Sequence, residues 1–156
     1  MQRRLILLLL LAPFAVKAEV SFKQVKQVYL KIKKVNNIKC PPLVLVQSKE
    51  ANASSSSKML TITTGMLKEL ANDAEIARVI GHEMAHWMLH HNGSSVKNEY
   101  AADELGVAFM YKAGYNVCKG IQYLYRRGDP GGRTHPSDVD RAVKFCERQS
   151  VCVLDV

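Results

Sequence analysis

The chain has 156 residues, of which 47% are hydrophobic and 23% charged, and its formal net charge is +8. This length suits one domain, and the hydrophobic share is typical of a packed globular core, which excludes wholesale disorder. Nine glycines and five prolines are too few for a collagen-like or low-complexity chain.

The first 18 residues have the pattern of an export signal. Arg3 and Arg4 precede the apolar run from Leu5 to Val16, and cleavage is expected after Ala18, where small residues suit a signal peptidase. The run has 12 residues, whereas a membrane-spanning helix needs roughly 20. We therefore expect a domain over residues 19–156 that is exported, either periplasmic or secreted, with no stable membrane anchor. An uncleaved anchor is the alternative.

Cleavage would also reduce the positive charge. The segment 1–18 holds three basic and no acidic residues, so the domain keeps 19 basic and 14 acidic residues, a net charge of +5. Many of these lysines fall within residues 23–39, where they read as the solvated face of a helix. No patch rich in arginine and aromatic residues accompanies them, so nucleic-acid binding is not expected.

The first part of the domain predicts a helix and then a short sheet. Apolar residues at helical spacing predict a helix over residues 22–35, which Ser21 can cap. The apolar run 43–46 reads as a buried strand. The serine run 54–57 favours a hairpin loop, because hydroxyl side chains bond nearby backbone groups, and residues 59–64 predict the return strand.

The rest of the domain is predicted to be helical. After one helical turn at residues 67–70, longer helices are expected at about residues 74–91, 96–113, 117–127 and 137–148. Asn92 and Gly93 form a stop signal for the first of these helices. The predicted fold class is α+β: an N-terminal helix, a short mixed or antiparallel sheet, and a helical body.

The clearest chemical signal is the pattern His-Glu-Met-Ala-His at residues 82–86. Four residues advance a helix by about 400°, so His82 and His86 point the same way and can bind one metal ion. Two imidazoles suit Zn²⁺, and Glu83 is placed to accept a proton from the attacking water. The flanking positions are apolar, as a buried metal-binding helix requires. The alternative is a pair of half-buried histidines without a metal.

The next predicted helix offers Glu99 and Asp103, one turn apart. If the two helices pack antiparallel, Glu99 comes level with His86, and Asp103 comes closer to the level of His82. Glu99 is therefore predicted as the third zinc ligand, and Asp103 as the carboxylate that orients His82 through its other ring nitrogen. Three nearby polar residues are expected to be solvated or structural: Glu104, His90 and His91.

Taken together, these motifs resemble those of the M48-type zinc metallopeptidases of the gluzincin group, and the chain is close in size to the minigluzincins. The resemblance covers about residues 22–148. The family's HExxH, ExxAD, Asn-Ala and Thr-His-Pro motifs, the last with an arginine six residues after its histidine, correspond to residues 82–86, 99–103, 52–53, 134–136 and Arg141.

The resemblance implies a zincin-like domain that uses one Zn²⁺ to hydrolyse peptide bonds in peptide or protein substrates, with Glu83 as general base. It also implies that Asn52 and Ala53 lie on an edge strand and bind substrate, that His135 hydrogen-bonds the oxyanion, and that Arg141 supports the site. A second reading stays open: a catalytically silent, zinc-stabilised domain that binds peptides. A third is a disulfide-stabilised module in which HExxH is incidental.

Four cysteines remain, and in an oxidising compartment an even number suggests two disulfides. If the helices at 117–127 and 137–148 form an antiparallel hairpin, Cys118 and Cys146 come level and can pair. This predicts the disulfides Cys118–Cys146 and Cys40–Cys152. The competing pair, Cys146–Cys152, would close only a short loop.

Overall fold

The structure is a computed structural model that describes the backbone of residues 19–148 and the side chains as far as residue 145. The predicted export signal and the C-terminal Cys152 lie outside these residues. The described residues form α1 (Phe22–Val35), β1 (Leu43–Val46), β2 (Ala53–Ser55), β3 (Leu60–Thr63), α2 (Thr64–Glu69), α3 (Asp73–Met88), α4 (Val96–Lys112), α5 (Val117–Arg127) and α6 (Asp138–Arg148). This is the predicted α+β fold.

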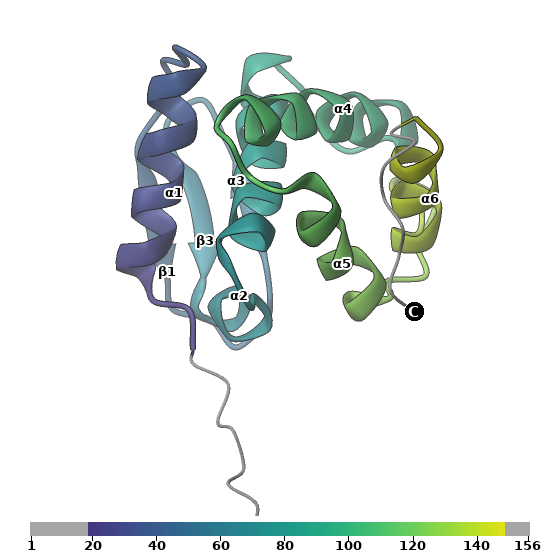
Figure 1. The fold of residues 1–156 in the computed structure, drawn as a ribbon, viewed down its shortest axis with the longest axis horizontal. Helices are drawn as coiled ribbons and strands as arrows, with labels where there is room; N and C mark the ends of the chain where they lie inside the picture. Colours follow the sequence, from purple (N-terminus) through teal and green to yellow (C-terminus); the bar gives the residue numbers. More distant parts are fainter. Residues whose placement is uncertain (1–18, 149–156) are drawn as a thin grey trace, which may run out of the picture.

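The sheet is small and mixed, with the strand order β1-β3-β2. β1 runs parallel to β3, with Leu43 opposite Leu60, and β2 runs antiparallel to β3, with Ala53 opposite Ile62. β2 is therefore an edge strand, as the family resemblance implies. α1 lies beside the sheet at one side of the molecule, and α5 and α6 lie at the other (Figure 1).

The prediction that residues 54–57 form a loop is wrong at its first two positions, because Ser54 and Ser55 belong to β2. Ser54 and Thr61 face each other across the strands, with their hydroxyl oxygens 2.7 Å apart, which stabilises the pairing. The turn itself begins at Ser56, whose side-chain oxygen accepts the backbone N–H of Met59. The serine run thus provides both the end of an edge strand and its turn.

α3 is the central helix and packs against α1, α4, α5 and β2 (Figure 1). Asn72 caps it by accepting the backbone N–H groups of Ala74 and Glu75. From residue 74 to residue 85, every side chain except that of Glu83 is buried. Within this stretch of α3, solvent therefore reaches the helix at Glu83.

α3 and α4 touch through their backbones at Gly81 and Gly106. A Cβ atom on Gly81 would lie 2.7 Å from the carbonyl oxygen of Gly106, and one on Gly106 would lie 2.8 Å from the backbone nitrogen of His82. Any larger residue would push the helices apart. The glycine pair thus sets the separation of the two helices beside the HExxH motif.

α3 ends at Met88, three residues earlier than predicted. His90 adopts a left-handed conformation, with φ of 52°, and the backbone N–H of His91 donates to the carbonyl oxygen of His86 at 3.1 Å. This is a Schellman-type helix end, in which a left-handed residue usually is glycine. The stop signal at Asn92 and Gly93 comes after the turn that already ends the helix.

The predicted Cys40–Cys152 disulfide is wrong, because Cys40 is a free thiol. Its sulfur is buried against α1, 3.7 Å from the hydroxyl of Tyr29, and burial raises the pKa of the thiol. Cys118 is disulfide-bonded. Its partner lies outside the described side chains, so the pairing Cys118–Cys146 stays a prediction.

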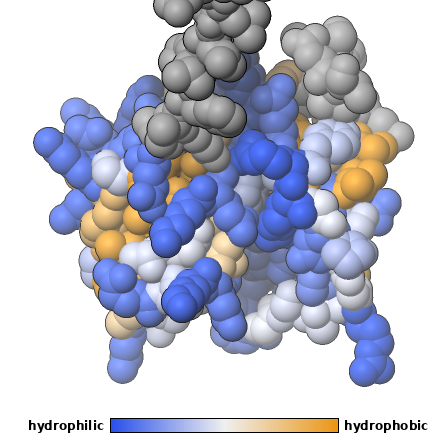
Figure 2. Space-filling view, turned by 90° about the horizontal axis from the view of Figure 1, so that it is seen from below, coloured by the Kyte–Doolittle hydropathy of each residue, from blue (hydrophilic) through white to orange (hydrophobic). Residues whose placement is uncertain are grey.

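One face of the molecule is mainly hydrophilic, with apolar groups gathered toward its left and right sides (Figure 2).

None of the helices formed by residues 19–148 has the length and apolar character needed to cross a membrane.

Replacing Gly106 with alanine is expected to lower the free energy of unfolding by about 1–3 kcal/mol, although alanine has the higher helix propensity. The added methyl group would overlap the backbone of His82. Urea denaturation of the metal-free protein measures the change. In the control Gly132→Ala, the new Cβ meets the ring of His135 at an ordinary 3.8 Å, so a change under about 0.5 kcal/mol is expected. An unchanged midpoint for Gly106→Ala would contradict the tight contact.

Candidate metal centre

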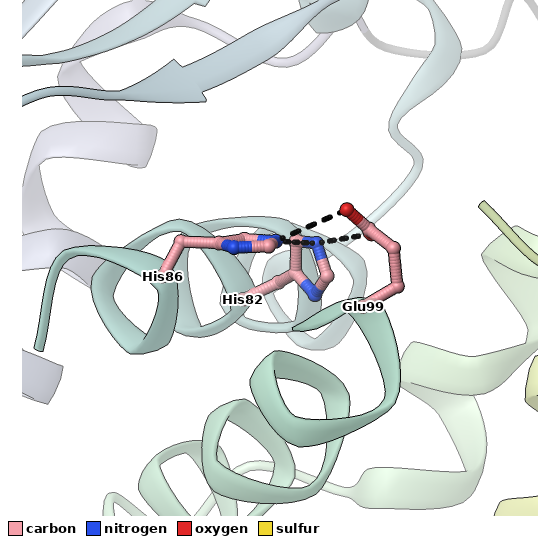
Figure 3. A group of neighbouring side chains, drawn as sticks. All are labelled: His82, His86 and Glu99. Carbon is pink, nitrogen blue, oxygen red and sulfur yellow. Dashed lines mark hydrogen bonds and ion pairs between the residues drawn. The ribbon is translucent and has the colours of Figure 1, made fainter. Parts of the chain in front are cut away.

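Three side chains from two helices converge on one point (Figure 3). The Nε2 atoms of His82 and His86, one turn apart on α3, lie 3.0 Å from each other. Glu99, in the first turn of α4, places one carboxylate oxygen 3.3 Å from His82 Nε2 and the other 3.5 Å from His86 Nε2. The turn between the two helices brings these three residues together, as the spacing predicted.

This donor set fits a zinc ion. One ligand atom from each of His82, His86 and Glu99 lies within 4.8 Å of the other two. Two imidazoles and one carboxylate are a common set of protein ligands for catalytic zinc, which keeps its fourth position open. His82 and Glu99 are each only 8% exposed, so the centre is held mostly inside the protein.

Asp103 supports the centre from behind and is fully buried. Its Oδ1 lies 2.8 Å from Nδ1 of His82, which is the contact that the sequence predicted. Arg141, on α6, donates from Nε to Oδ2 at 2.7 Å and from a terminal nitrogen to Oδ1 at 2.6 Å. Arg78, on α3, donates a further hydrogen bond to Oδ1. One carboxylate thus ties α3, α4 and α6 together.

The charges in this cluster stabilise one another. Burial opposes ionisation of Asp103, but the charge of Arg78 and the hydrogen bond from Arg141 outweigh it and hold the pKa of Asp103 well below its usual value. Burial likewise opposes ionisation of Glu99, and hydrogen bonds from His82 and His86 lower its pKa. Burial works against protonation of His82, yet its hydrogen bond to Asp103 raises the pKa of this histidine.

Sequence reasoning missed two residues of the site, Arg78 and His91. Arg78 is 1% exposed and lies four residues before His82, on the same face of α3. A charged residue inside a stretch predicted to be buried needs a charged partner, and that signal could have identified it. His91, which was expected to be structural only, places Nδ1 2.9 Å from Nδ1 of His86. Burial, followed by the charge of His86, lowers the pKa of His91.

A cleft of about 450 Å³ opens over the centre. Glu83 and the three predicted ligands line it from α3 and α4, and Asn52 and Ala53 line it from the sheet edge. His135 and Arg141 also border the cleft. The structure therefore brings the predicted site residues other than Asp103 to one cavity, and Asp103 lies directly behind His82.

The loop that carries His135 is fastened to α5. Asp138, which is fully buried, accepts a hydrogen bond from Nε of Arg127 at 2.6 Å and another from the backbone N–H of Asp129 at 3.0 Å. The His135 side chain is 40% exposed, and its Nε2 lies 3.6 Å from a carboxylate oxygen of Asp129. These contacts present the imidazole at the border of the cleft.

Asp103→Asn is expected to lower the free energy of unfolding by about 3–5 kcal/mol, because it leaves two buried arginines without their carboxylate. Urea denaturation of the metal-free protein tests this. Glu50→Gln, which alters an exposed acid in the loop before β2, is the control and should change stability by less than about 0.5 kcal/mol. Equal midpoints for the two variants would show that Asp103 does not hold the arginines.

The family model described as Peptidase family M48 matches the chain over residues 19–97 and 92–149. Together these matches span the whole described domain, from α1 to α6. The comparison with curated proteins finds no match to this chain.

Proposed function

The chain belongs to peptidase family M48, and from this membership we propose that it is a zinc-dependent endopeptidase with His82, His86 and Glu99 as the ligands of one zinc ion. Peptidases of this family depend on zinc, and their substrates are peptides or proteins. The observation that carries the proposal is the convergence of these three side chains beneath an open cleft. Hydrolysis of internal peptide bonds is the activity that such a cleft suits.

A zinc ion held there would polarise the scissile carbonyl and lower the pKa of water. Glu83 lies between the two histidines in the chain and is the only partly exposed residue from 74 to 85 of α3. Its carboxylate would accept a proton from the attacking water and deliver it to the leaving amine. His135 would donate a hydrogen bond to the substrate oxygen as negative charge develops on it.

The edge strand β2 supports binding of an extended substrate. The backbone N–H of Thr63 donates to the carbonyl oxygen of Asn52, so the backbone of Asn52 is directed toward β3. Along an antiparallel strand, the backbone N–H and C=O groups of successive residues point alternately toward the partner strand and away from it. The backbone groups of Ala53 and Ser55 therefore point away from β3, to the outer edge of the sheet. A peptide in the cleft would pair with these groups, and the side chain of Asn52 would hold it in register.

Glu83→Gln is expected to bind zinc with the wild-type stoichiometry and to lose most hydrolysis of a general substrate such as casein, because the amide cannot accept the proton. Metal analysis and a protease assay with and without chelator measure both properties. His86→Ala or Glu99→Ala should instead lose the metal.

The same experiment separates the alternatives. A Gln variant that cleaves casein at the wild-type rate would refute the role of Glu83. A wild-type protein that binds zinc and captures peptides without cleaving them would be the catalytically silent binding domain.

We also propose that the protein is exported and works in the periplasm or outside the cell. The support is the sequence of residues 1–18, with its basic start, apolar run and small residues before Glu19. Export would allow Cys118 and Cys146 to pair in an oxidising environment. The protein isolated from cells that export it is expected to begin at Glu19. Intact-mass analysis checks this, and a retained Met1 would contradict it.

A further inference from the structure

The ring nitrogens of His82 and His86 that face away from the centre, their Nδ1 atoms, contact different kinds of side chain. The outer nitrogen of His82 faces the buried carboxylate of Asp103. The outer nitrogen of His86 faces another imidazole, that of His91, at 2.9 Å. The rings of His86 and His91 meet edge to face, with centroids 5.0 Å apart and an interplanar angle of 72°.

The end of α3 produces this second contact. In a Schellman turn, the residue after the left-handed position returns onto the residue five positions before it, and the two side chains usually make an apolar contact. Here the left-handed residue is His90, and the backbone N–H of His91 donates to the carbonyl oxygen of His86. The contact that usually joins two apolar groups therefore joins two imidazoles.

The chemistry of imidazole then decides which nitrogen carries each proton. His86 directs Nε2 toward His82 and Glu99, so a neutral His86 that binds zinc through Nε2 keeps its proton on Nδ1. That N–H is a donor and needs an acceptor. Nδ1 of His91 is the atom within reach, so His91 must be neutral, with its own proton on Nε2.

We propose that His91 is the positioning residue of His86: its Nδ1 accepts the Nδ1–H of His86, which fixes the ring orientation and keeps Nε2 free for the metal. This inference rests on the zinc site proposed above. Partners of this kind behind a ligand histidine are worth about 10–100-fold in metal affinity. Each ligand histidine of α3 thus has its own partner.

Two substitutions of His91 distinguish the effect of its hydrogen-bond acceptor from the effect of its ring packing. In His91→Asn, the amide oxygen can occupy nearly the place of Nδ1, whereas His91→Phe keeps a ring but has no acceptor. A zinc competition titration is expected to show affinity about 10–100-fold lower for the Phe variant. The Asn variant should stay within a few-fold of wild type, as should the control His90→Asn, which alters the adjacent exposed histidine.

The titration needs no substrate, so it tests the inference even if the protein binds zinc without hydrolysing peptides. Wild-type affinity in the Phe variant, or an Asn variant as weak as the Phe variant, would overturn the role of the acceptor. Nitrogen-15 NMR of the zinc-loaded protein gives a second readout. It should show His91 protonated on Nε2, and a proton on Nδ1 of His91 would overturn the proposal.

Discussion

The backbone contact between α3 and α4 at Gly81 and Gly106 is the constraint on which the centre depends. Both glycines sit within one turn of residues that build the site, since His82 follows the first directly and Asp103 precedes the second by three positions. A carboxylate side chain is short, and it reaches an imidazole on another helix only when the two helices are unusually close. The absence of two side chains at the crossing therefore lets Glu99 and Asp103 approach the histidines of α3.

Closeness alone would not be enough, because the helices also enclose charged groups that must be paired. Asp103 carries one negative charge and lies among Arg78, Arg141 and His82, so the cluster compensates the cost of burying each member. The same cluster connects the last helix to the first half of the domain. α6 thus contributes to the metal centre through Arg141 without supplying a ligand.

Much of this architecture was predictable because it follows from local rules. The helix boundaries near Ser21, Ser95 and Asn72 follow from capping, and the meeting of His82, His86 and Glu99 follows from helical rise and a short turn. The misses depend on tertiary geometry. Ser54 and Ser55 form a strand only because β3 pairs with them, and His91 reaches His86 only because His90 accepts a left-handed backbone that most residues avoid. Residue spacing along the sequence predicts neither the strand pairing nor the left-handed backbone.

The shortness of β2 has a consequence for how folded molecules meet one another. An exposed strand edge is a template on which a second copy of a protein can extend the sheet, and proteins limit this hazard by keeping such edges short. β2 has three residues, two of them serines with small polar side chains. An edge this short offers too few backbone groups to join the sheets of two molecules. β2 can therefore stay exposed in the folded protein without promoting aggregation.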